Sequence, residues 1–454
     1  MSTLVFLITA MATLPFSNGR WMSAAAAFIG PAMLTLFIRR FDQKKGLLYG
    51  YLILTITSLV SWFTVNNVVS GPQIYFGVLF WLIAILIPYA ADRFFRPVGD
   101  SAFLKTLFLP MAWVSVDMLF SLLLADSGSI AYSQFENLPL LQLASITGMA
   151  GITFMIAWTA STVSWLFENR TRLKSVRAGI YLFLFVAGGI LEFGMHRLST
   201  QPPEGGELIP VAAITSNAIE KPSTELLLKK SLNAHETGAR LILWSEALAA
   251  NFDGLKEFTE KNNVYVFAAA GIQSEAGLLD NKVVLFDPGG EEALTYRKHN
   301  LAPGERSIPG EKTFRYLDTL SGRFGVAICA DLNYSHFMRA AGKNGIDILF
   351  EPAAEWPEVA RIQTAVALMR AVENGFNLVK ATKSGHSVVT DFTGRILAQT
   401  EKPEEETLIA SVPNRGSGTI YSVGGWLFGY LVLTAFLIVL ALKLKDSHFA
   451  TIQK

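Results

Sequence analysis

Apolar residues form long, nearly uninterrupted runs over the first part of this chain and again near its end. A helix of about 20 apolar residues crosses the hydrocarbon core of a bilayer. The runs predict eight membrane-spanning helices, at about residues 3–17, 21–38, 47–66, 72–92, 103–124, 143–166, 176–194 and 422–443. We therefore expect seven spans over residues 1–200, an eighth at 420–444 and a short cytoplasmic tail at 445–454.

The first run, residues 3–17, is short and ends in the polar stretch Ser17 to Arg20, which is also typical of a cleaved signal peptide. No strongly positive segment precedes this run, and another apolar run follows it at once. We therefore interpret residues 3–17 as a helix that is retained in the membrane.

Lysine and arginine are distributed unevenly among the loops between the predicted spans. The loops after spans two, four, six and eight are basic, through Arg39, Arg40, Lys44, Lys45, Arg93, Arg96, Arg170, Arg172, Lys174, Arg177, Lys443 and Lys445. The alternate loops hold little more than Arg20 and Arg197. Because basic loops stay in the cytoplasm, we predict cytoplasmic termini and an extracytoplasmic region at residues 205–415.

Residues 205–415 alternate between two kinds of apolar pattern. Strand-type runs lie at 209–214, 240–244, 264–269, 282–287, 294–297 and 324–328, and helical patterns at 223–238 and 252–262. Apolar strands that alternate with helices are typical of a layered α/β domain. A segment of this length can bury a core of its own.

Three polar residues follow predicted strands. They are Glu246, Lys298 and Cys329. A glutamate there can serve as a helix N-terminal charge, a lysine as solvated surface and a free cysteine as a small buried hydrophobe. Together they supply a base, a cation and a nucleophile, which are the groups that acyl transfer needs. A neighbouring ammonium is also expected to lower the pKa of the thiol.

Composition sharpens the interpretation of the cysteine. Cys329 is the only cysteine in the chain, and an unpaired thiol in an exported domain suggests a reactive group. The chain is 51% hydrophobic and 17% charged, and its net charge of +1 gives no indication of a nucleic-acid partner. The six histidines have no metal-ligand spacing and no phosphate-binding glycine loop occurs, so we expect no metal and no cofactor.

The sequences around these three residues resemble the nitrilase superfamily of carbon–nitrogen hydrolases. The resembling stretches are Trp244-Ser245-Glu246-Ala247, Tyr296-Arg297-Lys298, Gly325-Val326-Ala327-Ile328-Cys329, Arg370-Ala371-Val372-Glu373-Asn374 and Asp391-Phe392-Thr393-Gly394-Arg395-Ile396. The resemblance implies a four-layer αββα sandwich with a Glu–Lys–Cys triad. The expected fold class is therefore a membrane α-helical bundle joined to a nitrilase-type α/β domain.

The membrane part narrows the resemblance to the apolipoprotein N-acyltransferases of the bacterial inner membrane. The supporting stretches are Tyr132-Ser133-Gln134, Thr147-Gly148-Met149-Ala150-Gly151-Ile152-Thr153-Phe154 and Asn300-Leu301-Ala302-Pro303-Gly304-Glu305. This family implies ping-pong transfer of an acyl chain from a phospholipid donor, through a thioester on Cys329. The implied acceptor is the N-terminal amine of a diacylated lipoprotein.

Five further residues are candidates for supporting roles. Glu305 resembles a required glutamate of the family, although a surface carboxylate is an equal alternative. Asp331 orients the site or caps the following helix, and Trp356 belongs to a loop near substrate entry. Glu373 is expected on a helix behind the site, where a structural ion pair is the favoured role. Asp117 lies within a predicted span, where a polar partner on a neighbouring helix is favoured over catalysis.

The chain departs from the family pattern beside the nucleophile and in a later loop. It has Cys329-Ala330-Asp331 for the usual Cys-Tyr-Glu, and Ala354-Glu355-Trp356-Pro357 where Asn-Asp-small-Trp-Phe is usual. These changes keep two alternatives open, a membrane-anchored amidase that hydrolyses a C–N bond and a non-catalytic lipid-binding homologue. Eight spans argue against the first alternative, and the intact Glu–Lys–Cys set argues against the second.

Overall fold

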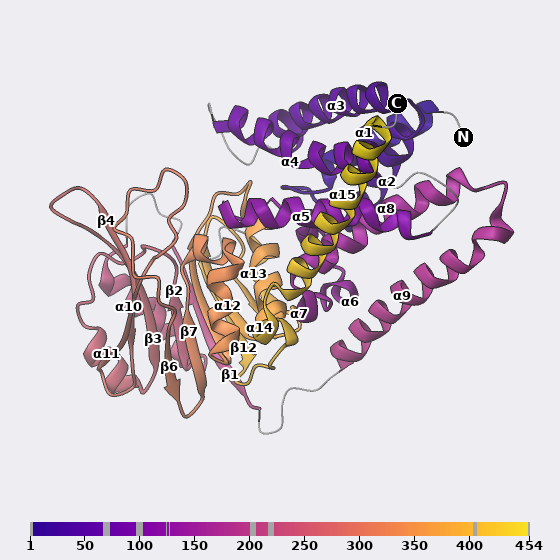
Figure 1. Cartoon of the computed structure of the whole chain (residues 1–454). Helices are drawn as coiled ribbons and strands as arrows, with labels where there is room; N and C mark the ends of the chain where they lie inside the picture. The colour runs from indigo at the N-terminus through magenta and orange to yellow at the C-terminus, as the bar shows by residue number, and fades with distance from the viewer. Residues whose placement is uncertain are drawn as a thin grey trace. The chain divides into compact units, whose positions relative to one another are not determined.

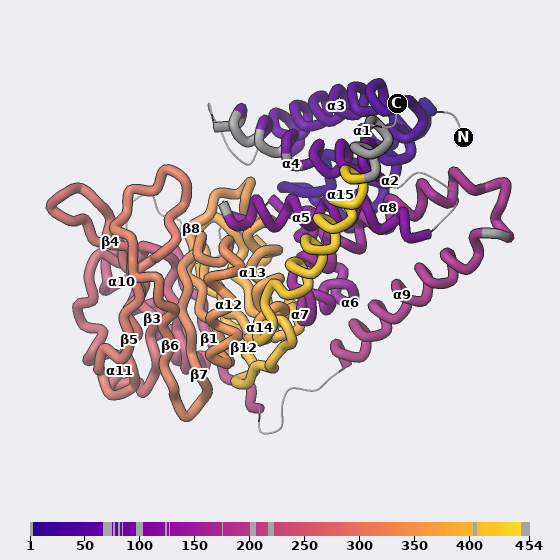
Figure 2. Tube along the Cα trace, viewed as in Figure 1, coloured from indigo at the N-terminus to yellow at the C-terminus, as the bar shows by residue number. Residues whose placement is uncertain are grey.

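The computed structural model describes residues 3–66, 73–96, 103–123, 125–126, 128–199, 206–216, 222–402 and 406–452. The chain forms two compact units, Met1–Leu198 with Gly424–Lys454, and Ser199–Val423, which we call the helical unit and the α/β unit (Figures 1 and 2). The predicted span ends at residues 72 and 124, and the predicted domain boundaries at 200 and 205, lie outside the described residues.

A helix occupies the position of every predicted span. The helical unit contains α1 (Thr3–Thr13), η1 (Leu14–Phe16), α2 (Ala24–Ile38), α3 (Gln43–Val60), η2 (Ser61–Val65), α4 (Gln73–Phe95), η3 (Phe103–Leu107), α5 (Phe108–Leu123), η4 (Ile130–Gln134), α6 (Leu138–Leu141), α7 (Ala144–Thr147), α8 (Met149–Glu168), α9 (Leu173–Ser199) and α15 (Leu427–Ile452). Within the described residues, five helices are long and apolar enough to cross a membrane: Gln43–Val65, Phe103–Leu122, Met149–Glu168, Val176–Ser199 and Leu427–Lys445. The first two predicted spans form shorter apolar helices, Thr3–Phe16 and Ala24–Ile38.

The sixth predicted span begins later than its composition suggests. Hydropathy places its start at residue 143, but α8 begins at Met149. Gly148 has φ +64°, and its N–H donates to Ala144 O at 2.9 Å, which ends α7. A left-handed residue cannot continue an α-helix, so the apolar run is divided into short helices followed by α8.

The helical unit has a core in which α15, α5 and α8 pack together. Val114 and Met118 of α5 are buried against Val432 of α15. Phe154 of α8 meets Phe428 of α15 edge to face, with ring centroids 5.8 Å apart. The last helix of the chain is therefore integrated with helices that precede the α/β unit in sequence.

The α/β unit contains two six-stranded sheets. Its elements are β1 (Leu208–Ile214), α10 (Thr224–Glu236), β2 (Leu241–Trp244), α11 (Leu255–Asn262), β3 (Tyr265–Gln273), β4 (Leu279–Phe286), β5 (Glu292–Arg297), β6 (Arg315–Thr319), β7 (Gly322–Val326), η5 (Cys329–Asn333), α12 (Ser335–Lys343), β8 (Ile348–Ala354), α13 (Ala360–Asn374), β9 (Asn377–Lys383), β10 (Val388–Thr390), β11 (Ile396–Gln399), β12 (Thr407–Pro413) and α14 (Ile420–Gly424). The strand orders are β12-β1-β2-β3-β4-β5 and β11-β10-β9-β8-β7-β6.

The two sheets pack face to face, with α10 and α11 on one outer face and α12 and α13 on the other (Figure 1). Phe267 of β3 stacks on Phe350 of β8, with ring centroids 3.7 Å apart, and Phe324 of β7 contacts both rings. Buried strands with apolar side chains on both faces need a layer on each side, which explains the arrangement. The predicted nitrilase-type αββα fold is confirmed.

The strand pattern also places the polar residues that follow each strand. β1, β2 and β3 are mutually parallel, as are β7, β8 and β9. Carboxyl ends of parallel strands emerge at one edge of a sheet, and ligand sites in open α/β sheets form there. Glu246 follows β2, Cys329 follows β7 and Glu355 follows β8.

Candidate active site

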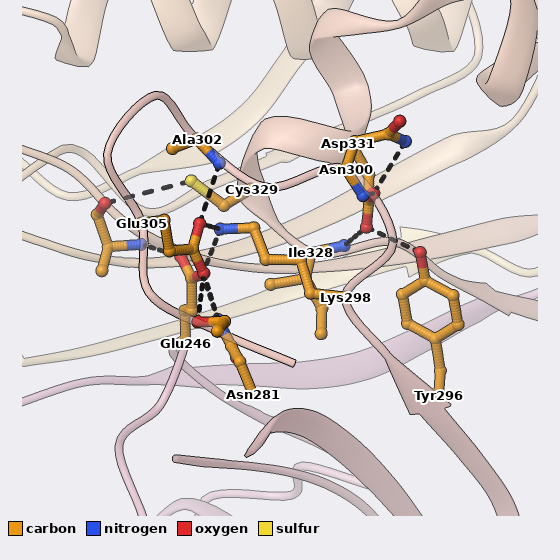
Figure 3. A network of polar contacts seen from close by, with 12 residues as sticks. Glu246, Asn281, Tyr296, Lys298, Asn300, Ala302, Glu305, Ile328, Cys329 and Asp331 are labelled. Atoms are coloured by element: carbon orange, nitrogen blue, oxygen red, sulfur yellow. Dashed lines mark hydrogen bonds and ion pairs between the residues drawn. The ribbon is translucent and has the colours of Figure 1, made fainter. Parts of the chain in front are cut away.

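Lys298 lies between two glutamates at the centre of the polar network in Figure 3. Its Nζ is 2.7 Å from Glu246 Oε1 and 2.7 Å from Glu305 Oε2. The lysine side chain is 2% exposed. Antiparallel β4 and β5 bring it there, because Lys298 directly follows β5. The structure thus unites two residues that the sequence predicted for the site with a third, Glu305, that it left undecided.

The charges in this cluster stabilise one another. Burial alone would lower the pKa of Lys298, but the charge of Glu246 and the hydrogen bonds to both glutamates act against it, and the pKa is raised. Burial alone would raise the pKa of Glu305, but the charge and hydrogen bond of Lys298 outweigh it and lower the pKa. Near neutral pH the lysine is therefore an ammonium and Glu305 a carboxylate.

Glu246 is held by two donors that the sequence pattern did not single out. Asn281 of β4 donates Nδ2–H to Glu246 Oε1 at 2.7 Å, and the Ala354 N–H donates to Glu246 Oε2 at 2.9 Å. Asn281 immediately precedes the apolar run at 282–287 from which a strand was predicted. The apolar pattern therefore did not indicate a functional role for it. Ala354 contributes its backbone N–H, and a methyl side chain gives no indication in the sequence that the residue belongs to a polar site.

Cys329 begins η5 in a left-handed conformation, with φ +47°. Ala247, next to Glu246, has φ +52°. Non-glycine residues in this region cost of order 1–3 kcal/mol and are concentrated at functional sites. The thiol donates to Ala354 O at 3.9 Å, and no hydrogen bond joins it to Glu246 in the part of the chain that the structure describes.

The expectation that a neighbouring ammonium lowers the pKa of the thiol is confirmed for Lys298, but two larger effects outweigh it. Burial raises the pKa of Cys329 well above its ordinary value, and the charge of Glu246 raises it further. Lys298 acts in the predicted direction, but its effect is smaller. The thiol is therefore protonated at neutral pH and needs a base to become a nucleophile.

Asp331 joins the loop that carries the cysteine to the loop that follows the lysine (Figure 3). Its carboxylate accepts hydrogen bonds from Tyr296 OH at 2.7 Å, the Asn300 N–H at 2.8 Å and the Ile328 N–H at 3.0 Å. Asp331 is fully buried. It therefore links the two loops, because both of its carboxylate oxygens accept hydrogen bonds from donors in these segments.

Asp331→Asn is expected to destabilise the protein by about 1–3 kcal/mol, because one of its acceptor oxygens becomes an NH₂ that faces existing donors. Thermal unfolding of the purified protein measures this loss. Asp253→Asn, in an exposed turn after β2, is the control and is expected to stay within about 0.5 kcal/mol of the unchanged protein. Equal stability of the two variants would contradict the cross-linking role of Asp331.

Trp356 and Glu373 lie beyond the contacts described above. Trp356 follows β8 and is 46% exposed. Glu373 of α13 is fully buried and forms an ion pair with Arg370, whose Nε donates to Leu332 O of η5 at 3.0 Å. The Arg370–Glu373 pair is thereby connected to η5, the short helix that begins at Cys329.

Asp117 belongs to α5 in the helical unit. Its Oδ2 accepts hydrogen bonds from Ser129 Oγ at 3.1 Å and from Thr153 Oγ1 of α8 at 3.2 Å. A polar partner on a neighbouring helix is thus present for this acid. The contacts connect α5 to α8 within the bundle.

The cluster offers a thiol, two carboxylates and an ammonium at the strand ends. Within the described ranges, no group of three or more histidine, cysteine, aspartate or glutamate side chains is arranged to hold a metal ion. Such a set can carry out acyl transfer, in which a base activates the thiol and a cation stabilises the oxyanion.

Two family models match the chain, one over each unit. Residues 215–420 match the family described as carbon-nitrogen hydrolase. Residues 9–162 match the family described as apolipoprotein N-acyltransferase N-terminal domain. The two matches together span most of the chain and come from both units.

Curated relatives resemble this chain along most of its length. An apolipoprotein N-acyltransferase of Geobacter metallireducens is 23% identical over 93% of this chain and 92% of its own length. One from Vibrio cholerae is 25% identical over 86% of this chain and 87% of its own length. Among solved structures, an amidase from a Nesterenkonia species aligns with a TM-score of 0.42 and 20% identity, over 48% of this chain and 94% of the amidase.

Proposed function

The chain belongs to the apolipoprotein N-acyltransferase family of multi-pass membrane proteins, and we propose that it moves a fatty acyl chain from a phospholipid to the N-terminal amine of a diacylglyceryl-cysteine lipoprotein. The observation that carries the proposal is the buried Lys298 between Glu246 and Glu305, in the same polar network as the only thiol of the chain (Figure 3). Both proposed substrates are lipids, which agrees with the five membrane-length helices of the described chain.

In the first half-reaction, Glu246 takes the proton of the Cys329 thiol. The sulfur attacks the ester carbonyl carbon of the phospholipid, a C–S bond forms and the C–O bond breaks. Glu246 then gives its proton to the departing alkoxide, so that a lysophospholipid leaves and a thioester remains. The raised pKa of the thiol supports this order of events, because a protonated thiol requires a base.

Lys298 stabilises the oxyanion of the tetrahedral intermediate. An ammonium has three N–H donors, and the bonds to Glu246 and Glu305 use two of them. The remaining donor is available to the negative oxygen. A donor of this kind increases the rate of acyl transfer by a factor of about 10²–10³.

In the second half-reaction, the amine of the lipoprotein attacks the thioester carbon. The C–N bond forms, the C–S bond breaks, and Glu246 transfers the amine proton to the sulfur. Glu305 assists by holding Lys298 in place. It is anchored in turn by Ser307 Oγ at 2.9 Å and by the Ala302 N–H at 2.9 Å.

We place the α/β unit on the extracytoplasmic side of the bacterial inner membrane, with both termini in the cytoplasm. The distribution of basic residues among the loops supports this orientation. Cysteine labelling provides the test, because a Cys329→Ser chain with one new cysteine in a chosen loop reports the side of that loop. A membrane-impermeant maleimide applied to intact spheroplasts is expected to label Asn251→Cys but not Lys174→Cys. The reverse pattern would invert the topology.

The chemical proposal is tested by incubating the purified protein with phospholipid and measuring the mass of the peptide that contains Cys329. An acyl adduct is expected, and a diacylated lipopeptide should then remove it with formation of a triacylated product. An adduct that water alone clears at the same rate would make the protein a hydrolase. Failure to form any adduct would favour a lipid-binding homologue.

A further inference from the structure

A second buried charge cluster lies in the α/β unit, outside the contacts of Lys298. Lys380 of β9 is fully buried, and its Nζ is 2.5 Å from Glu355 Oε1 and 3.6 Å from Glu351 Oε1. Both glutamates come from the neighbouring parallel strand β8 or its end, and each side chain is 1% exposed. We call Lys380, Glu351 and Glu355 the β8–β9 cluster.

Stability alone does not explain the β8–β9 cluster. Replacing a buried ion pair by apolar residues of similar volume is often neutral or stabilising. One lysine can neutralise one of the two carboxylates. Burial accordingly raises the pKa of Glu351 to about 8, with the charge of Lys380 opposing and that of Glu355 adding to it. Burial raises the pKa of Glu355 as well, with the charge of Lys380 opposing it, so two buried carboxylates share one lysine.

The end of β8 touches both residues of the proposed base–nucleophile pair. The Ala354 N–H donates to Glu246 Oε2 at 2.9 Å, and Ala354 O accepts from the thiol of Cys329 at 3.9 Å. The Glu246 N–H donates to Ala353 O at 3.4 Å. Two consecutive residues of one strand end therefore set where the carboxylate and the sulfur lie.

Glu355 connects this strand end to the neighbouring strand β9. Its N–H belongs to the same peptide unit as Ala354 O and donates to Lys383 O at 3.0 Å. Its carboxylate pairs with Lys380, and a Cβ added at Gly385 would lie only 2.3 Å from Glu355 Oε2. A methyl group at residue 385 would therefore require the Glu355 carboxylate to move from its position beside Lys380.

We propose that Lys380 and Glu355 are positioning residues for the acyl-transfer site: their buried ion pair fixes the end of β8, where the Ala353–Ala354 peptide holds Glu246 and the Ala354–Glu355 peptide contacts Cys329. Glu351 shares the lysine, with its Oε1 3.6 Å from Lys380 Nζ. The inference rests on the proposed function, because it assumes that Glu246 is the base for Cys329.

The reactivity of the thiol measures this geometry directly. Cys329 is the only cysteine, so alkylation by iodoacetamide reports this one sulfur without background. At neutral pH the protonated thiol depends on Glu246, whereas at high pH hydroxide from solvent can remove the proton. A displaced Glu246 is therefore expected to slow alkylation most at neutral pH, with a deficit that shrinks as the pH rises.

The experiment compares alkylation rates of the full-length protein in detergent from pH 6 to pH 10. Lys380→Met removes the cation, Glu355→Gln removes the charge at constant shape, and Gly385→Ala pushes on the carboxylate without changing any charge. Gly418→Ala is the matched control, because a Cβ there has nothing within 4 Å. Glu246→Gln shows the profile of a site without its base.

At pH 7, Lys380→Met and Gly385→Ala are expected to slow alkylation about tenfold or more, and Glu355→Gln less, while Gly418→Ala matches the unchanged protein. If Lys380→Met does not fold, Gly385→Ala and Glu355→Gln carry the test. Profiles equal to that of Gly418→Ala, or a deficit that is the same at every pH, would overturn the inference. An unchanged profile for Glu246→Gln would instead overturn the base assignment in the proposed function.

Discussion

Replacing Cys329 by alanine is expected to reduce acyl transfer by about 10³-fold or more, because no thioester can form without the sulfur. The chain has no second cysteine that could substitute for it. The measurement follows a labelled acyl chain from phospholipid to a diacylated lipopeptide, with the purified protein in detergent or in vesicles. Intact mass analysis after exposure to phospholipid should show no adduct on the variant.

Cys329→Ser separates the loss of the nucleophile from any change in the structure of the site, because serine is close to cysteine in size. A serine hydroxyl is a much weaker acid than a thiol, and the burial that already raises the pKa of Cys329 also disfavours an alkoxide. Cys329→Ser is therefore expected to be inactive while it melts at the same temperature as the unchanged protein. Near-normal transfer by either variant would exclude the thioester mechanism.

Lys298→Met is expected to reduce both activity and stability. It removes the proposed oxyanion donor, which is worth about 10²–10³ in rate. It also leaves Glu246 and Glu305 facing one another without a cation. Breaking a buried pair in this way costs about 3–5 kcal/mol. Acyl transfer and thermal unfolding at pH 7 measure the two effects.

The stability loss of Lys298→Met should depend on pH in a defined direction. The pKa of Glu305 is lowered by Lys298, so its contribution to stability is present above its ordinary value of 4.5 and is lost as the pH falls through the lowered value. The difference from the unchanged protein should thus be widest near neutral pH and narrow in acid. Lys256→Met, which breaks an exposed pair with Glu291, is the control and should cost less than about 1 kcal/mol. Equal losses for the two lysines would contradict the buried role of Lys298.

Local patterns in the sequence located the first strands and helices of the α/β unit but not β6 or β8 to β12. β2 consists of four buried apolar residues, and an apolar run without charges is recognisable wherever it stands. The same argument located the helices of the membrane part, and Glu246, Lys298 and Cys329 were found because each lies within three residues of the end of a strand. These features depend on near neighbours in the chain, which are visible in sequence.

Contacts between distant segments decided the rest. Glu246 meets Lys298, 52 residues away, and Ala354, 108 residues away, and no periodicity connects such positions. Likewise, Gly148 ends α7 and delays the start of α8 in a run that contains no charged residue. The backbone donor of Ala354, the acceptor role of Asp331 and the β8–β9 cluster depend on the register of strands that pair only in the folded state.

The sequence by itself determined that this chain crosses a membrane several times, contains a layered α/β domain and supplies a base, a cation and one thiol. Only the tertiary structure decided that the cation lies between two carboxylates and that the pKa of the thiol is raised above its ordinary value. The physical reason is burial: removing Cys329 from water raises its pKa more than the charge of Lys298 lowers it. Residue types can be read along the chain, but the balance between desolvation and charge depends on which groups folding brings together.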